Sequence, residues 1–271
     1  DIGCGNGAFL VAFGRRRDGW DLHGSELDER SLATLSTIPN FRKLHTCGLS
    51  EIGENFDCIS LIHALEHFEY PELLLGQMRQ CLSGSEAAVV VQVPDWRAHP
   101  FDFLIADHLL HFGVETLEAL LRRSGFEVLS IAQGWIPNEI SAVARRGDRM
   151  AATLGSADTD IAAIHADIGR RLRWLEEVSN EARGLAVAGE IGIFGSSIAA
   201  SWLHGAIGEK GAFFVDEDPN RQGRRHLGRP ILTPGEVPQG SSVFVPLAPR
   251  AAGSIALRLG VAGGPRFVAP C

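Results

Sequence analysis

Apolar runs that suit β-strands alternate with helical patterns along the first half of the chain, and the alternation starts again near Glu190. Such an alternation favours parallel sheets covered by helices, so the sequence predicts two α/β units. The run AAVVVQV is nearly all apolar, which is typical of a strand buried on both faces. The expected strands of the first unit are 20–25, 56–61, 87–93, 126–133 and 138–144, and its expected helices are 7–16, 29–37, 70–81 and 114–124.

A long amphipathic helix is expected between the two units. Apolar residues recur at spacings of three and four from Ile161 to Val178, Ser156 and Asp158 are candidate N-caps, and Gly189 is a stop signal. The predicted organisation is a first domain over 1–147, a linker helix over 156–188 and a smaller domain over 189–271. We expect the smaller domain to be Rossmann-like, with about four strands. Its expected elements are strands at 191–194, 212–215 and 243–247 and helices at 198–207 and 250–259.

Composition excludes several classes of protein. The net charge of −8, without any Lys/Arg-rich run, argues against a nucleic-acid partner. Apolar stretches stay shorter than the roughly 18 residues that a membrane span requires. The five cysteines form no CxxC pair, which argues against a zinc knuckle or a disulfide framework and favours a reducing, cytoplasmic setting.

A glycine loop opens the chain, with the sequence Asp1-Ile2-Gly3-Cys4-Gly5-Asn6-Gly7. Glycines let the backbone turn sharply and let a ligand approach it, and the following helix offers free N–H groups. The spacing Gly3-x-Gly5-x-x-Ala8 also satisfies the dinucleotide fingerprint, and a glycine turn without a ligand is a third interpretation.

Two acids narrow this choice. Asp1 stands two residues before the first glycine, where a carboxylate would repel a pyrophosphate but pair with an ammonium group. Glu26 ends the next predicted strand, where an acid binds the two hydroxyls of a ribose. An amino group and a ribose in one ligand describe S-adenosylmethionine.

The motifs DIGCGNG, Glu26 and FDCISLIHALEHFEYP, in this order, resemble the class I S-adenosylmethionine-dependent methyltransferases over residues 1–145. The resemblance implies a Rossmann-like sheet of seven strands, whose first strand would end at Asp1 and lie largely upstream of it. It also implies a set of cofactor-binding residues. In that set the loop residues Asp1, Gly3, Cys4 and Gly5 hold the methionine part of the cofactor, and Glu26 binds the ribose. Leu27, Gly48 and Leu49 lie beside the adenine.

Two histidine-rich segments are candidates for the acceptor end of the site. The stretch His63-Ala64-Leu65-Glu66-His67 resembles the HxLEH segment of methyltransferases that act on small metabolites and sugars. The resemblance implies that His63 faces the methionine part, and that Glu66 and His67 face the acceptor, with His67 as base. Alternatively, Glu66 and His67 cap the following helix.

The second segment, DHLLHF at 107–112, resembles another acceptor-lining stretch and makes His108 a candidate catalytic residue, with His111 second. The HxxxH and HxxH spacings of the two segments also suit a metal. The methyltransferase resemblance accounts for both segments without one, so no metal is predicted.

The smaller domain carries a second glycine loop, GIFGSSIAA, in which Ser197 replaces the second glycine of a dinucleotide loop. Asp216 lies in the ribose-binding place. The tandem layout resembles sugar C-methyltransferases, which implies a nucleotide-linked sugar as acceptor.

The alternative functions are an NAD-type oxidoreductase, which would lack a Tyr-x-x-x-Lys pair here, and a silent nucleotide-binding scaffold. A homodimer is also expected, with the second domain as one candidate for dimerisation.

Overall fold

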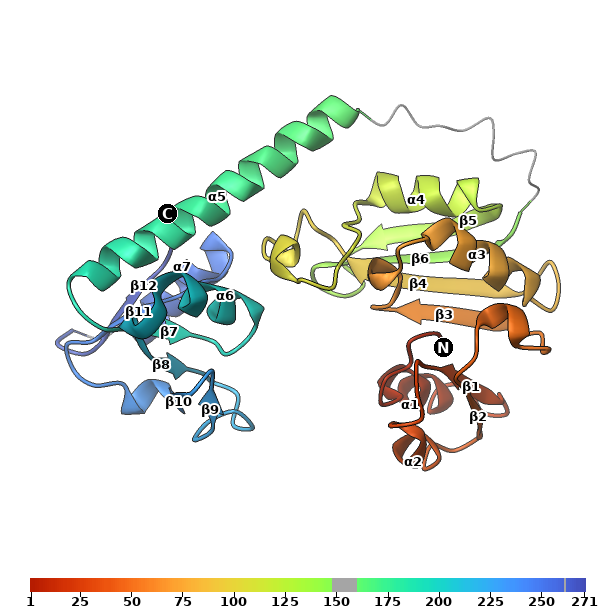
Figure 1. Ribbon diagram of the computed structural model, residues 1–271, viewed down its shortest axis with the longest axis horizontal. Helices are drawn as coiled ribbons and strands as arrows, with labels where there is room; N and C mark the ends of the chain where they lie inside the picture. The colour runs from red at the N-terminus through yellow and green to blue at the C-terminus, as the bar shows by residue number, and fades with distance from the viewer. Residues whose placement is uncertain (148–159, 261) are drawn as a thin grey trace. The chain divides into compact units, whose positions relative to one another are not determined.

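The computed structural model describes residues 1–147, 160–260 and 262–271, and the chain divides into two compact units, Asp1–Thr159 and Asp160–Cys271. Each unit is an α/β structure (Figure 1). The candidate N-caps Ser156 and Asp158, and most of the predicted boundary at 147–155, lie outside the described residues.

The first unit is built around a twisted sheet. β1 (Leu22–Ser25) pairs with β2 (Phe41–His45), and β3 (Cys58–Ile62), β4 (Ala88–Pro94), β6 (Glu139–Arg146) and β5 (Phe126–Gln133) follow one another in a four-stranded sheet. Ile2 forms parallel bridges to Ser25 and to Leu61 and so lies between the two parts. The order is therefore β2-β1-Ile2-β3-β4-β6-β5.

Two features of this sheet differ from the sequence prediction. β6 runs antiparallel to both of its neighbours, so the sheet is mixed rather than parallel. β2 was not predicted at all, because its sequence FRKLH exposes Arg42 and Lys43 at an outer position of the sheet and lacks an apolar run. An edge strand with charged side chains resists pairing with other chains, and the same charges hide it from pattern analysis.

Helices α3 (Pro71–Gln80) and α4 (Val114–Arg123) cover one face of the four-stranded part of the sheet (Figure 1). Their apolar faces meet the strands, where Met78, Leu117 and Leu121 are fully buried with Leu61 and Val91. α1 (Ala8–Gly14) and the single-turn α2 (Leu32–Leu35) pack with β1 and β2 in a separate small core. The first histidine-rich segment directly follows β3, and the second lies just before α4.

The second unit has a six-stranded sheet in the order β12-β11-β7-β8-β10-β9, so the expected number of four strands is wrong. The three strands that pattern analysis missed are only two to four residues long, too short for a clear pattern. The strands are β7 (Ile191–Phe194), β8 (Gly211–Val215), β9 (Arg225–His226), β10 (Arg229–Leu232), β11 (Ser242–Phe244) and β12 (Arg266–Val268), accompanied by α6 (Ile198–Ile207) and α7 (Pro249–Leu259).

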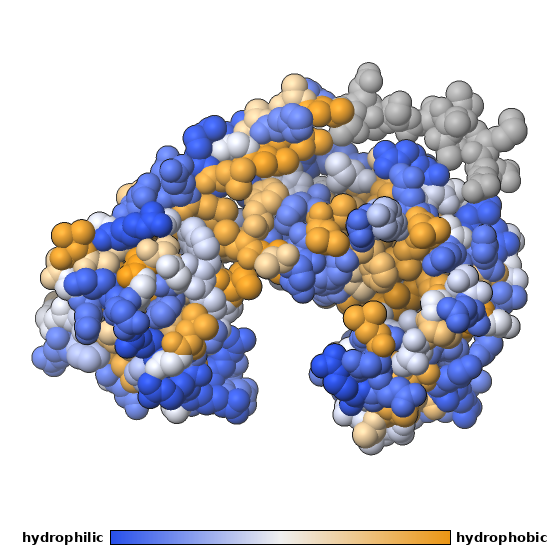
Figure 2. Space-filling view, in the orientation of Figure 1, coloured by the Kyte–Doolittle hydropathy of each residue, from blue (hydrophilic) through white to orange (hydrophobic). Residues whose placement is uncertain are grey.

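The helix predicted as a linker is α5 (Ile161–Val187), and its N-cap is Asp160, whose side chain accepts a hydrogen bond from the Ala163 N–H at 2.9 Å. The C-terminal half of α5 packs into the second unit, because Val178 and Ala182 are buried in that unit's core. Apolar side chains are visible along α5 (Figure 2). Within the described ranges, no helix combines the length and the apolar character that crossing a membrane requires.

Candidate functional site

The first glycine loop turns through three left-handed residues, with φ values of +68° at Gly3, +52° at Gly5 and +81° at Gly7. Side chains other than glycine rarely adopt this region. A Cβ at Gly7 would lie 2.5 Å from Ile38 Cδ1, whereas a Cβ at Gly5 would meet nothing within 4 Å. The loop is thus closely packed on its Gly7 side and open on its Gly5 side.

Glu26 lies at this open side, and Asp1 lies at the start of the loop. Glu26 Oε1 accepts a hydrogen bond from the Gly5 N–H at 2.5 Å, and its Oε2 accepts one from the Leu27 N–H at 3.2 Å. Asp1 Oδ1 accepts a hydrogen bond from Ser60 Oγ at 2.9 Å. The structure therefore brings the predicted Gly5 and Glu26 into direct contact and leaves the side chain of Leu27 94% exposed beside them.

Cys4 is placed differently from the other loop residues. Its side chain is buried against β1, where a Cβ at Gly24 would lie 2.5 Å from the Cys4 sulfur. Its N–H bonds the Ser25 carbonyl, and its own carbonyl accepts from the Gly7 N–H at 2.8 Å. Burial raises the pKa of the thiol. Through its buried side chain, Cys4 packs the loop onto the sheet.

The expected adenine contacts lie after β2. Gly48 directly precedes a short 3-10 turn, Leu49–Glu51, and has an extended backbone. The Leu49 side chain packs partly buried against the main core, and its carbonyl lies 3.6 Å from the Cys81 sulfur. Leu49 is thus anchored at the edge of the sheet, while Gly48 lies in the turn that leads into it.

Backbone bonds hold the two histidine-rich segments together. The Glu66 carbonyl accepts hydrogen bonds from the Leu109 and Leu110 N–H groups at 2.9 and 3.1 Å. His67 Nδ1 lies 2.8 Å from the Asp107 carbonyl oxygen, to which it donates. The helix-cap interpretation of Glu66 and His67 is not met, because the N-cap of α3 is Tyr70, without a side-chain cap bond. Residues 65–67 and 107–110 therefore form one site.

Asp102, which sequence reasoning missed, organises the histidines of the second segment. It is 1% exposed, and its two carboxylate oxygens lie 2.8 Å from His108 Nδ1 and 2.6 Å from His111 Nδ1. Burial opposes ionisation, but the hydrogen bonds from both imidazoles outweigh it and lower the pKa of Asp102. The one available signal was an acid between two phenylalanines, in a stretch too apolar for a solvated carboxylate.

A second unpredicted acid, Glu139 at the start of β6, lies 3.6 Å from His63 Nε2. His63 Nδ1 is also 3.6 Å from Glu66 Oε1, and its backbone has the rare φ of +52°. Pairing with Glu66 raises the pKa of His63, and burial raises the pKa of Glu139 to about 7. The His63 side chain thus lies among acceptor-site acids, although the resemblance assigned it to the methionine part.

Glu66 itself is 1% exposed. Within the described part of the chain, no hydrogen-bond donor reaches either of its carboxylate oxygens. One ligand atom from each of Glu66, His67 and His108 lies within 4.8 Å of the others. All three predicted catalytic residues are therefore brought to one point, with a buried carboxylate that lacks a hydrogen-bonding partner.

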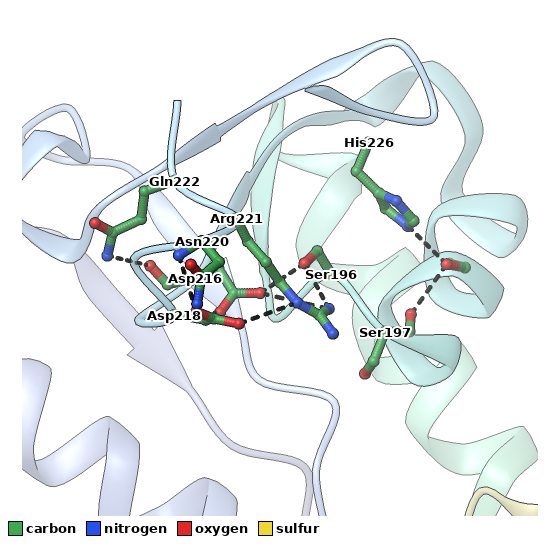
Figure 3. Close-up of polar contacts among 9 residues, drawn as sticks. Ser196, Ser197, Asp216, Asp218, Asn220, Arg221, Gln222 and His226 are labelled. Carbon is green, nitrogen blue, oxygen red and sulfur yellow. Dashed lines mark hydrogen bonds and ion pairs between the residues drawn. The ribbon is translucent and has the colours of Figure 1, made fainter. Parts of the chain in front are cut away.

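Side chains from the segment after β8 close the second glycine loop (Figure 3). Ser196 Oγ donates to Asp216 Oδ2 at 2.6 Å, and Arg221 Nη1 donates to Ser196 Oγ at 3.0 Å. Asp216 Oδ1 accepts from the Asp218 N–H at 3.0 Å. The acid expected to bind a ribose is thus engaged on both oxygens, and Ser197 retains the Cβ that a pyrophosphate loop avoids.

Residues 1–131, a little under half of the chain, match the model of a family described as "Methyltransferase domain". No curated protein matches the chain in sequence. Similar solved structures include the pyocyanin biosynthetic protein PhzM (23% identity, 54% of this chain and 49% of that one, TM-score 0.46). Another is the Burkholderia thailandensis 1,6-didemethyltoxoflavin-N1-methyltransferase with bound 1,6-didemethyltoxoflavin and S-adenosylhomocysteine (20%, 55% and 70%, TM-score 0.45).

The magnesium protoporphyrin IX methyltransferase of Synechocystis, solved with bound S-adenosylmethionine, is similar at 15% identity (54% of this chain, 68% of that one, TM-score 0.41). The chain spans about half the length of PhzM. The family match falls within the first unit, which has a Rossmann-like sheet of the methyltransferase kind, and the second unit lies outside it.

Proposed function

We propose that the first unit binds S-adenosylmethionine at the glycine loop and transfers its methyl group to a small-molecule acceptor. The observation that carries this proposal is the contact between Glu26 and the Gly5 N–H at the open side of the loop. A carboxylate oxygen has two lone pairs, so Glu26 keeps acceptor capacity for the two ribose hydroxyls while the loop fixes its position.

The remaining cofactor contacts follow from this placement. Asp1 supplies a carboxylate for the ammonium group of the methionine part. The open face of the loop at Gly5 admits the methionine chain of the ligand, and Gly3 provides the left-handed turn beside it. Leu27, with its exposed apolar side chain, packs against the adenine on one side. Gly48 and Leu49 border the adenine on the other side.

Glu66, His67 and His108 form the acceptor end of the site. The acceptor atom attacks the sulfonium methyl group in line, the carbon–sulfur bond breaks, and S-adenosylhomocysteine leaves with the bonding electron pair. Where the acceptor must lose a proton, a neutral imidazole Nε2 receives it. His67 and His108 both suit this role, because their Nδ1 atoms are directed to the oxygens of Asp107 and Asp102.

As acceptor class we propose a nucleotide-linked sugar. Support comes from the polar lining of the acceptor end, which suits hydroxyl or keto groups, and from the resemblance of the tandem layout to sugar C-methyltransferases. An NAD-type oxidoreductase is disfavoured by Ser197 and by the engaged Asp216. The acceptor class is tested by measuring S-adenosylhomocysteine release with a panel of nucleoside diphosphate sugars, and release with free sugars alone would contradict it.

Isothermal titration with S-adenosylmethionine tests the cofactor proposal on the chain as it is. Glu26→Gln removes the charge that accepts the ribose hydroxyls, and hydrogen bonds to a charged group contribute about 1.5–3 kcal/mol, so affinity should fall by roughly 10–100-fold. Asp216→Asn is the matched control in the second unit and should leave this affinity unchanged. Heat with NAD and none with S-adenosylmethionine would overturn the proposal.

A further inference from the structure

We propose that Glu66, His67 and His108 bind a divalent cation of the zinc class at the acceptor end of the site. One ligand atom from each residue lies within 4.8 Å of the other two. Two imidazole nitrogens and one carboxylate are a ligand set that zinc accepts, with a fourth position left open. The role of the cation rests on the proposed methyl transfer, but its binding can be tested without it.

The tautomers of both histidines favour this site. A metal-binding imidazole generally donates its other ring N–H to a carboxylate or a backbone carbonyl, which fixes the lone pair on the metal-facing nitrogen. His67 Nδ1 lies 2.8 Å from the Asp107 carbonyl, and His108 Nδ1 lies 2.8 Å from Asp102 Oδ1. Both Nε2 atoms therefore carry lone pairs. Asp102 is the outer partner that such a site requires.

Glu66 supplies the second, independent observation. Its carboxylate is 1% exposed, and among the described residues no donor forms a hydrogen bond with either oxygen. Its nearest ionic neighbour is His63, at 3.6 Å. Burying a carboxylate without hydrogen bonds is unfavourable, so a buried charge is usually paired or bound to a metal. A cation between Glu66 and the two imidazoles would satisfy this group.

Two other clusters of ligand-type residues lack this capacity. In the cluster of Asp102, His108 and His111, the carboxylate already binds both Nδ1 atoms directly, at 2.8 and 2.6 Å. In the cluster of His23, His45 and Glu54, the two rings bond each other at 3.1 Å, and Lys43 lies 3.2 Å from the carboxylate. Neither leaves a set of free lone pairs facing one point.

The cation would change how the acceptor is held. His67 is about one-third exposed at its side chain, so the open coordination position is accessible from solvent. An acceptor bearing a hydroxyl or keto oxygen would bind this position through that oxygen, and the cation would lower the pKa of a bound hydroxyl. With the cation present, His67 and His108 would hold it through Nε2 and would not themselves act as the base. The structure thus favours acceptors with an oxygen next to the methylated atom over purely apolar ones.

Isothermal titration of the chelator-treated chain with ZnCl2, followed by metal analysis after dialysis, tests the site. We expect one equivalent with a dissociation constant in the micromolar range or below. The isosteric Glu66→Gln and the exposed His67→Gln should each weaken binding by at least about 100-fold, because each removes a ligand. Asp102→Asn should weaken it by roughly 10–100-fold, as an outer partner does.

His45→Ala and His165→Ala are the controls, the first in the competing cluster and the second on α5. Both should bind zinc as the parent chain does. Absence of binding in the parent, or binding lost in His45→Ala but kept in Glu66→Gln, would overturn the inference. Titration with S-adenosylmethionine separates the two proposals: zinc heat without cofactor heat removes the methyl transfer only, and the reverse removes the metal site only.

Discussion

Each unit places a glycine loop after a strand and an acid after the next strand, yet the two loops are built differently. In the first unit Glu26 bonds the Gly5 backbone N–H, and Gly5 faces open space. In the second unit Asp216 bonds the Ser196 hydroxyl and the Asp218 N–H. The second loop has only one left-handed glycine at its strand end, Gly195, and its acid is already engaged by the unit's own groups.

The comparison shows that a shared topology does not give a shared capacity to bind a ligand. Glu26 accepts one backbone N–H on each oxygen, from Gly5 and Leu27, and each oxygen keeps a lone pair for a ribose. The Asp216 side chain is only 14% exposed and is enclosed by a hydroxyl, an N–H and a guanidinium, so it has less left to offer. Arg221, which bonds Ser196, also lies 4.0 Å from Asp216 Oδ2. The second loop is stabilised internally, and the first is open to a ligand.

The largest expected effect is on stability, and it tests whether the first glycine loop is packed more closely than the second. Gly7→Ala introduces a Cβ that would lie 2.5 Å from Ile38 Cδ1 at a φ of +81°, so overlap and backbone strain add. We expect a loss of about 3 kcal/mol in the stability of the first unit. Gly195→Ala, at φ +83° with open space around it, should cost only about 1 kcal/mol.

Hydrogen exchange resolved by unit measures both changes, because the units need not unfold together. Equal costs at Gly7 and Gly195 would show that the first loop is not packed as closely as the geometry indicates.

The pH dependence of stability should differ between the units. Burial raises the pKa of Glu139 from its ordinary 4.5 to about 7, so its protonated form stabilises the first unit below pH 4.5 and this contribution is lost as pH rises through 7. In the second unit, Arg258 lowers the pKa of Glu217, which gives a contribution present above pH 4.5 and lost on acidification.

Glu139→Gln should therefore raise the stability of the first unit at pH 8 by about 2 kcal/mol and change it little at pH 4. Hydrogen exchange at both pH values, with a chelator present, measures this difference. A gain of the same size at both pH values would contradict the raised pKa.

Ser196→Ala tests the internal stabilisation of the second loop. The substitution leaves Asp216 Oδ2 without its hydroxyl donor and Arg221 Nη1 without one acceptor. We expect a loss of about 1 kcal/mol in the second unit and no change in S-adenosylmethionine affinity. Hydrogen exchange resolved by unit measures the stability. A weaker cofactor affinity would show that the two loops are not independent.

The smallest effect is expected for the exposed ion pair of the second unit. Arg258 Nη1 and Nη2 each lie 2.6 Å from a Glu217 carboxylate oxygen, but both side chains are more than one-third exposed. Solvent screening limits such a pair, so Arg258→Ala should lower the stability of the second unit by less than Ser196→Ala does. The same measurement at high salt should show a still smaller difference. A cost above that of Ser196→Ala would mean that the ion pair, and not the loop, carries the second unit's polar stabilisation.

Local patterns predicted much of this architecture. The strand β5 coincides with its predicted range, and α6 does as well, because long apolar or amphipathic stretches identify their own secondary structure. β2 and the short strands β9, β10 and β12 were missed, since strands of this kind are stabilised by pairing with neighbours distant in sequence. The same reason hides the antiparallel direction of β6, which depends on which strand lies beside it.

For the site, the sequence by itself determined which residue types are available: the loop glycines, the acid after β1 and the two histidine-rich segments. Only the tertiary structure decided which of them meet. It joined Glu66 and His67 to His108 across forty residues, buried Cys4 in the core, and brought in Asp102. Chemical identity is local to a residue, whereas burial and hydrogen-bond partners, which set what a side chain can do, arise from packing between distant segments.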